Sequence, residues 1–478
     1  MTTILAIATE EWRLWLRSRV AILALLIVST IIAATSLLNA QRMAEERDQR
    51  MHQQTVTEQT FLEQPDRHPH RMVHYGHYVF RTPPPLSLVD PGVDFVTGQS
   101  IFLEGHRQNT PMFADVRASA NLGSFQLISP AFVYQVLVPL LLIALGHSVF
   151  VRERESRTLA PLLAQGVSGS SLYSGKFLAL ATLAFTLLLP LLILAVITTF
   201  MGEQCVLVAS LTLVYAAYLL VWCALIALTS ALSPSRGLAL GVLVFIWLMW
   251  ALILPRLAVA SAGATISVPG KLETDFQMYA DIRALGDGHN ASDPAFARLR
   301  ANLLAQYDAD TVDDLPVNFR GVVAQTSEAE LTTLMNEYAD RRMHAEQSQS
   351  LHIDRFGWLS PAIAISTGSR HLAGTDLANH HRFLREAEEV RFDFVQGLNQ
   401  SHVEVLSYAD DINRNQSAEA SQRARISAEN WEVLNLFEFA PDPSAERASR
   451  SAGSLAQLGL WLVMLLAVGK LASARIRP

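Results

Sequence analysis

Histidines are the side chains of this sequence whose types and spacing most directly suggest chemistry. Thirteen of the fourteen lie outside the long apolar blocks, and four fall close together in a Pro-rich stretch: His68, His70, His74 and His77. Imidazoles at such spacing bind copper or zinc. The competing interpretation is a polar loop that uses histidine for hydrogen bonding. These four residues are therefore a candidate metal site, against an ordinary loop.

The sequence offers no other catalytic machinery. No nucleophile–base pattern stands out, and both cysteines lie in apolar blocks, which disfavours a disulfide framework or a Cys-based metal site. The nearest approach to a phosphate-binding loop is Gly169–Lys176. It has five residues between its glycines instead of four, and Phe177 stands where a magnesium-binding hydroxyl is needed. We therefore expect no ATPase site and no cofactor in this chain.

A charged stretch, residues 152–176 (RERESRTLAPLLAQGVSGSSLYSGK), interrupts a region that is otherwise apolar. Its first half is polar at Glu153, Glu155, Arg157 and Thr158, and then carries an apolar stripe: Leu159, Leu162 and Leu163. Gly166 is a typical helix-ending residue. The pattern predicts a short amphipathic helix at one membrane face, whose stripe can dock into a partner. An ordinary interfacial loop helix is the alternative.

The elements that position this stretch are long apolar blocks, each long enough to cross a bilayer. Six spans are predicted: residues 20–41, 131–151, 177–202, 206–232, 238–255 and 451–470. The first block is too long for a cleaved signal peptide, which is the rival interpretation. Before it, residues 1–19 carry Trp12 and Trp15 on one helical face, which favours an interfacial helix over a merely solvated one.

Charge distribution predicts the topology. The short segments 1–19, 152–176, 233–237 and 470–478 together hold eleven Lys and Arg against four acids, whereas the whole chain has a net charge of −7. Basic loops stay in the cytoplasm. Both termini, including the tail 471–478, are therefore predicted to be cytoplasmic, and the polar inserts 42–130 and 256–450 extracytoplasmic. The expected fold is an all-α membrane protein: six transmembrane helices, an N-terminal interfacial elbow helix and a mainly helical extracytoplasmic domain.

The charged stretch resembles the signature between the second and third spans of type-2 ABC exporter permeases, at Glu153, Thr158, Leu159, Leu162, Leu163, Val167, Ser168, Gly175 and Lys176. The start, EEWRLWLRSR, resembles that family's elbow helix, at Glu11, Arg13, Arg17 and Arg19. The second insert resembles a subgroup loosely described as multicopper-enzyme-maturation permeases. The matching motifs are LPVNFRG (315–321), LSPAIAIS (359–366), AGTD (373–376), HHRF (380–383) and EEVR (388–391).

The resemblance implies a permease subunit in a bacterial cytoplasmic (inner) membrane, associated with a second, identical subunit and two ABC ATPase subunits that hold ATP and magnesium. The stretch 152–176 would be the coupling helix. Membrane lipids and an extracytoplasmic protein are further expected partners, and nucleic acid is not. The transported substrate is not implied. Two other functions stay open: a mechanotransmitting ABC complex that acts on an outer partner without transport, and a membrane-anchored metal-binding domain.

Overall fold

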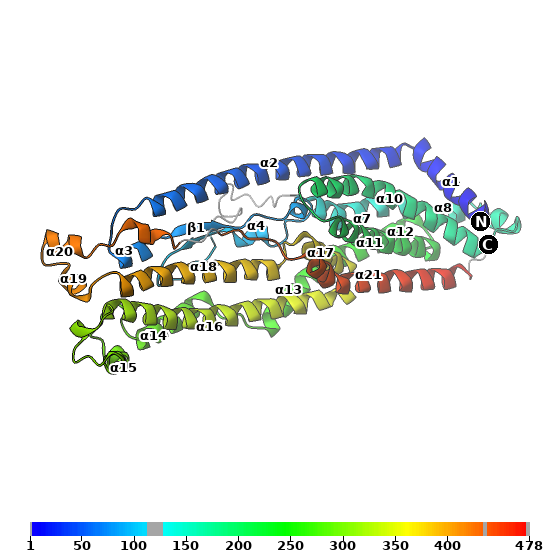
Figure 1. Ribbon diagram of the computed structural model, residues 1–478. Coiled ribbons are helices and arrows are strands. Elements are labelled where there is room, and N and C mark those ends of the chain that lie inside the picture. Colours follow the sequence, from blue (N-terminus) through cyan, green and yellow to red (C-terminus); the bar gives the residue numbers. More distant parts are fainter. Residues whose placement is uncertain (1, 112–127, 434–436, 475–478) are drawn as a thin grey trace.

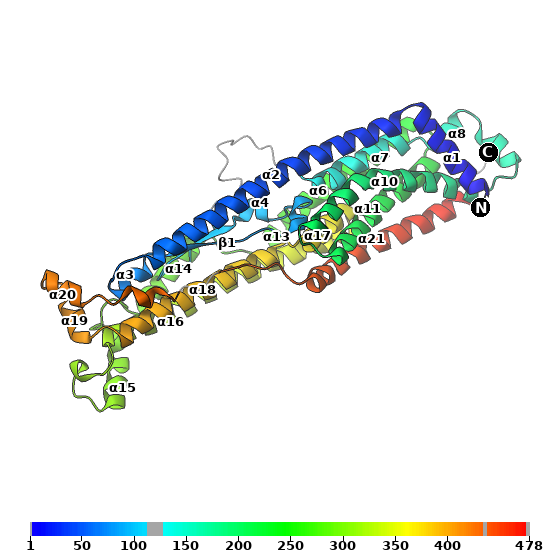
Figure 2. The same ribbon diagram turned by 45° about the horizontal axis from the view of Figure 1, so that its top comes forward.

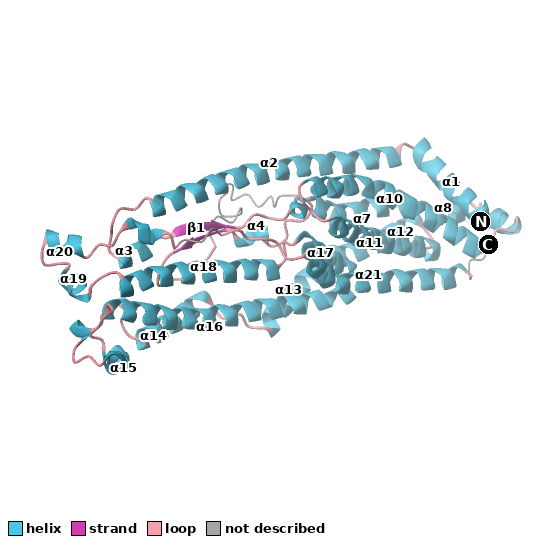
Figure 3. Cartoon of the chain, in the orientation of Figure 1, coloured by secondary structure: helices cyan, strands magenta, loops and turns pink. Residues whose placement is uncertain are grey.

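The computed structural model describes residues 2–111, 128–433 and 437–474, and it is elongated and almost wholly helical (Figure 1, Figure 3). Within these ranges, strands β1 (His77–Phe80) and β2 (Ser100–Leu103) form one antiparallel pair, with His77 opposite Leu103. Six helices are long and apolar enough to cross a membrane: Val20–Leu62, Pro130–Glu155, Gly169–Phe200, Cys205–Leu232, Arg236–Thr265 and Ser444–Ser473. The predicted fold class is confirmed.

The half of the molecule that carries both chain ends is a helical bundle (Figure 1, Figure 2). Its elements are α1 (Thr2–Arg17), the first part of α2 (Val20–Leu62), α6 (Pro130–Phe132), η2 (Val133–Leu137), α7 (Val138–Gly146), α8 (Val151–Glu155), α9 (Leu159–Ala164), α10 (Gly169–Phe200), α11 (Cys205–Leu232), α12 (Arg236–Leu248), η3 (Met249–Ile253), α13 (Leu254–Thr265) and α21 (Ser444–Ser473). Helix α11 is its centre, with Tyr215, Tyr218 and Trp222 fully buried.

Two prolines inside the spans, Pro139 and Pro255, are accommodated by local changes of helix geometry. A π-helical turn precedes each of Pro139 and Pro255: η2 comes before α7 and η3 before α13. A proline cannot bond the carbonyl four residues earlier, which is Gln135 for Pro139. The Tyr218 hydroxyl donates to that carbonyl at 2.6 Å. Neighbouring side chains thus satisfy backbone groups that proline leaves free, as a membrane interior requires.

Helix α17 (Pro361–Ala373) changes the predicted boundary between membrane and insert. We assigned its sequence to the polar second insert, yet it packs between α11 and α21 and joins the core of the bundle through Ile365 and Leu372. The Tyr215 hydroxyl lies 2.9 Å from the Ser369 hydroxyl, which ties α17 to the centre of the bundle. With 13 residues, α17 is too short to span a bilayer and gives no hydropathy signal.

The other half of the molecule is built from the two inserts, around the paired long helices α16 (Phe319–Arg355) and α18 (Leu377–Glu404). Shorter elements surround them: α3 (Pro69–Val73), η1 (Pro85–Leu88), α4 (Asp94–Thr97), α14 (Lys271–Ala284), η4 (Pro294–Phe296), α15 (Ala297–Tyr307), η5 (Val312–Asp314), η6 (Phe356–Trp358), α19 (Tyr408–Asn413), α20 (Ala418–Arg423) and η7 (Ala428–Trp431). Phe61 of α2 packs on Phe394 of α18 with ring centroids 5.7 Å apart, so the two inserts share a core.

Several helices run past the predicted ends of the spans. Helix α2 continues to Leu62, well into the segment assigned to the first insert, because residues 42–62 contain many strong helix formers and no Gly or Pro. The helix of the fifth span continues to Thr265, and α21 begins at Ser444. Residues 112–127 of the first insert and 475–478 of the tail lie outside the described residues.

Candidate functional site

The charged stretch forms two short helices where one amphipathic helix was expected. Helix α8 continues the second span, and α9 follows after a break at Arg157, whose φ is +59°. Gly166 ends α9 in the left-handed region, at φ +87°, as the sequence predicted. The Ser168 hydroxyl then accepts a hydrogen bond from the Ser171 amide and caps α10. The stretch lies at the end of the molecule that also carries α1 (Figure 2).

A buried ionic cluster joins this stretch to α1 and α10. Glu11 of α1 accepts two hydrogen bonds from Arg152 Nη2, at 2.6 and 2.8 Å, and a further one from Lys176 Nζ. The Lys176 ammonium also donates to Glu153 at 2.7 Å, and Glu153 accepts from the Thr158 hydroxyl at 2.6 Å. Glu11 is 1% exposed and Lys176 3% exposed. We name these four charged residues, Glu11, Arg152, Glu153 and Lys176, the elbow cluster.

The elbow cluster contains two acids and two bases and is therefore formally neutral. Burying charges is tolerated when each is paired and hydrogen-bonded, and removing one partner leaves an uncompensated charge. Close packing accompanies the pairing, since a Cβ on Gly175 would lie 2.7 Å from the Ile7 side chain. Helix α1 is thus held directly on α10 next to the cluster.

A second set of contacts holds the stretch on the turn between α11 and α12. Arg154 donates to the carbonyl of Ser233 and, at 2.9 Å, to that of Ala231. Glu155 forms an ion pair with Arg236 Nε at 2.6 Å. Four elements of the bundle, α1, α10, α11 and α12, are therefore bonded to this short segment.

The predicted leucine stripe faces the protein and not the exterior. Leu159 is buried in the core of the bundle, and Leu163 packs against that core. Leu162 is half-buried. The exposed side of α9 and its flanks carries small and polar residues instead: Arg157, Ala160, Pro161, Ala164 and Gln165. A docking partner would meet this exposed side, which corrects the expectation that the leucines themselves dock.

The other predicted elbow residues lie outside the cluster. Arg13 is exposed and pairs with Glu10 at 3.3 Å on the surface of α1. Arg17 and Arg19 are exposed, and Arg19, at φ +60°, makes the bend between α1 and α2. The family-like pattern therefore mixes one buried anchor, Glu11, with three surface cations.

The four histidines of the candidate metal site go to three different places. His70 and His74 lie together with His106 and His289, whereas His68 lies with His402 and Asp411. His77 is buried between Phe61 and Phe394, and neither of its ring nitrogens has a hydrogen-bond partner among the described residues. Burial lowers the pKa of His77 to about 4. The set proposed from sequence is thus not one site.

Another buried ion pair closes the opposite end of the spans. Glu203, in the turn between α10 and α11, pairs with Arg447 of α21 at 3.0 Å and also accepts from the Leu86 amide of the first insert. From Lys176 to its end at Phe200, α10 rises about 36 Å at 1.5 Å per residue, so the two charged sites stand about as far apart as the two faces of a bilayer.

The motifs of the second insert that resemble the permease subgroup hold structural positions. Asn318 caps α16, and Asp376 caps α18. Arg391 is buried and pairs with Glu328 at 2.6 Å. His381 lies 2.9 Å from Glu346, which joins α18 to α16. Caps and buried ion pairs account for these motifs without a ligand.

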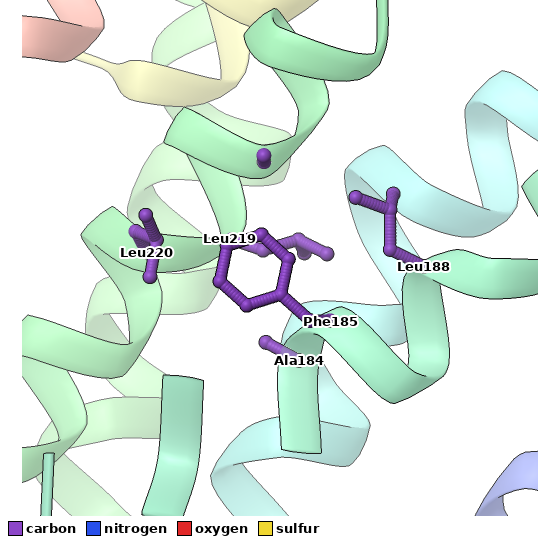
Figure 4. A pocket seen from close by; sticks show the side chains of 6 residues that line it. Ala184, Phe185, Leu188, Leu219 and Leu220 are labelled. Atoms are coloured by element: carbon purple, nitrogen blue, oxygen red, sulfur yellow. The ribbon is translucent and has the colours of Figure 1, made fainter. Parts of the chain in front are cut away.

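A shallow hollow lies between two spans of the bundle. Figure 4 shows this shallow depression between α10 and α11, too small to hold a water molecule, whose lining is wholly apolar: Ala184, Phe185, Leu188, Ala216, Leu219 and Leu220. Ligand sites typically measure about 300–1,000 Å³ and contain a few polar groups. This depression is therefore a poor candidate for a substrate site.

Comparison with known proteins gives one match. A family model described as a domain of unknown function (DUF3526) matches residues 273–440, most of the second insert, from within α14 through α18 and beyond. No curated protein and no solved structure matches the chain. The match covers about a third of the chain and lies wholly outside the candidate coupling site.

Proposed function

We propose that this chain is the transmembrane permease subunit of an exporter-type ABC transporter, in which separate ATPase subunits drive movement of a substrate across a bacterial cytoplasmic membrane. ATP and magnesium belong to those subunits. The stretch 152–176 is the contact with them, so the end that carries α1 and α9 faces the cytoplasm. The inserts are then extracytoplasmic. A second, identical subunit and lipids cover the exposed apolar faces of α2, α12 and α21.

The observation that supports this proposal is the combination of an exposed helix with buried anchors. Helix α9 presents small and polar side chains to the exterior, whereas the preceding residues are tied to α1 and α10 through the elbow cluster. A force applied to α9 is thereby passed to several spans. A loop that merely connects two spans has no need of the buried charges of Glu11 and Lys176, because burying charges is costly.

The first test introduces charge on the exposed side of α9 and leaves the cluster intact. Ala160 and Ala164 are exposed and four residues apart, on one side of the helix. We expect Ala160→Asp/Ala164→Asp to abolish co-purification with the ATPase encoded nearby, or to uncouple its ATP turnover from the permease. The matched control is Ala301→Asp/Ala305→Asp, an exposed pair with the same spacing on α15, at the other end of the molecule.

The control pair is expected to leave ATPase binding unchanged. The contrary result is that both variants retain the ATPase and wild-type turnover, while the chains stay folded by circular dichroism. The exposed side of α9 would then not be a coupling surface, and the proposal would fail.

Mechanotransmission without transport is the second candidate function, and the continuity of α2 favours it. Its 43 residues form one rod of about 64 Å, from the bend at Arg19 to the core of the inserts at Phe61. This hypothesis predicts that the distance between spin labels at Ala301 of the two subunits differs between the nucleotide-free and the ATP-bound complex. Gln53→Pro, at an exposed position of α2, should abolish that change without releasing the ATPase. Labels that do not move in the wild type exclude this function.

A further inference from the structure

Four histidines from three separate segments meet in the half of the molecule built from the inserts. His70 lies in α3 and His74 is the residue that ends it, so the two occupy one side of a helical turn. His106 lies just beyond β2, and His289 lies in the loop after α14. One ring nitrogen of each lies within 4.8 Å of one ring nitrogen of each other histidine.

The spacing of the donor atoms fits a tetrahedral ion. The Nε2 atoms of His70 and His74 are 3.4 Å apart. Zinc–nitrogen bonds of about 2.0–2.1 Å place the donors of a tetrahedral site about 3.3–3.4 Å from one another. The wider separations within the group need small side-chain rotations, and exposed His74 and His289 leave an open route for entry.

Two of the imidazoles are oriented by carboxylates, as is typical of metal ligands. His106 Nδ1 lies 2.7 Å from Glu328 Oε2, and its Nε2 is buried with no hydrogen-bond partner among the described residues. His289 Nδ1 lies 3.2 Å from Asp287. His106 also adopts φ +64°, an uncommon conformation for a residue with a side chain. The free nitrogen of each ring is the one left to bind an ion.

Neutral imidazole is the form that binds metal. Packing four imidazoles together stabilises the fold little by itself, because the ring nitrogens are polar and need bonding partners. A metal ion would supply that partner.

We propose that His70, His74, His106 and His289 bind one divalent transition-metal ion, and that the ion is Zn²⁺. An all-imidazole set selects metals of the zinc and copper class over calcium or magnesium, and the 3.4 Å donor spacing matches a tetrahedral zinc ion. The ion would join α3 and the loop after β2, in the first insert, to the loop after α14, in the second. Only His289 lies within the region matched by the DUF3526 model.

The second group of possible ligands, His68, His402 and Asp411, does not fit a metal. The Asp411 carboxylate already accepts hydrogen bonds from Asn318 and Arg414, and it lies 3.0 and 2.7 Å from the two imidazoles. Arg320 stands 3.6 Å away. Two nearby guanidinium groups oppose a further cation, so this group is a structural ion network.

The test is a zinc titration of the full chain, purified in detergent with an affinity tag that contains no histidine and stripped with a chelator. Titration against a chromogenic chelator should give one tightly bound Zn²⁺ per chain. His74→Ala and His289→Ala should each weaken binding at least tenfold. Both side chains are exposed, so these variants should fold. His52→Ala and His344→Ala, at exposed positions of α2 and α16, are the matched controls and should bind as the wild type does.

Cobalt gives an independent readout of geometry, because tetrahedral Co²⁺ has intense visible d–d bands that octahedral Co²⁺ lacks. These bands should appear with the wild type and be lost with His74→Ala and His289→Ala. Sub-stoichiometric zinc, or binding that the two variants leave unchanged, overturns the site. Tight binding of Cu²⁺ with no binding of Zn²⁺ overturns the zinc assignment. None of these outcomes depends on an ATPase partner or on transport.

Discussion

Glu11→Gln should be among the most destabilising single substitutions outside the apolar core. Adjacent glutamates on α1 provide the comparison: Glu11 is buried and bonded to Arg152 and Lys176, whereas Glu10 is exposed and makes one surface contact with Arg13. Removing the charge of Glu11 leaves two cations, buried Lys176 and half-buried Arg152, facing Glu153 alone. Breaking a buried pair in this way costs about 3–5 kcal/mol, while Glu10→Gln should cost less than about 1 kcal/mol.

The assay is reversible unfolding of the purified chain in mixed micelles with increasing mole fraction of a denaturing detergent, followed by circular dichroism. A double variant tests the cause. Glu11→Gln/Lys176→Met removes one charge of each sign and restores a neutral cluster, so we expect it to be more stable than Glu11→Gln alone. The coupling between the two substitutions should reach about 1.5 kcal/mol or more, within the range measured for interacting neighbours.

Two results would refute this reasoning. Equal losses of unfolding free energy for Glu10→Gln and Glu11→Gln would mean that the elbow cluster contributes nothing to stability. Strict additivity of Glu11→Gln and Lys176→Met would mean that their charges do not interact, whatever the geometry of their contact.

Three further predictions concern other parts of the chain. Gly175→Ala should lower the unfolding free energy by about 1–3 kcal/mol, because the new methyl group meets α1, whereas Gly241→Ala, with open space around it, should not. His77→Phe should raise the unfolding free energy by about 1–3 kcal/mol, because two unsatisfied nitrogens leave the core. The pKa of His77 is lowered to about 4 in the folded state, so the wild type loses stability as pH falls below the unfolded pKa of about 6.5. The variant should not show this loss. A hydrogen bond from His381 is the main cause that lowers the pKa of Glu346 to about 2, against the opposing effect of burial. That carboxylate therefore stabilises the fold above its unfolded pKa of about 4.3, and the contribution is lost as pH falls toward 2; acid unfolding of Glu346→Gln should show a shallower dependence over this interval.

Hydropathy placed the spans because it is a local signal. Each of the six predicted blocks corresponds to an apolar helix of sufficient length, and Gly166 ends a helix where its type suggests. The errors arose where the signal is weak. Residues 42–62 are polar yet helical, and α17 is apolar but too short to register as a span. The fifth span was predicted to end at residue 255, whereas the helix continues through Pro255, which follows a π turn.

Contacts between distant residues could not be read from the sequence. Nothing in the spacing indicates that Glu11 meets Lys176, because the partners are 165 residues apart. The metal candidate shows the same limit. The interval between His70 and His74 was visible, but His106 and His289 enter the group only through the packing of α3 and α14 beside the paired long helices. Conversely, the sequence grouped His77 with its neighbours as a possible ligand, whereas its place in β1 buries the side chain in an apolar core.

The charged sites at the two ends of α10 suggest how, in the proposed coupling, a push on α9 would travel. At one end of the helix Lys176 is bonded to Glu11 and Glu153, and at the other Glu203 is bonded to Arg447 and to the backbone of η1. A helix held at both ends by buried ion pairs moves as a unit, since loss of either set leaves charges unpaired in a poorly hydrated site. Displacement of α9 would therefore reach α21 and the first insert together through α10. In this mechanism the inserts move because α10 is rigid. Movement of α9 reaches them without a polar path through the bundle.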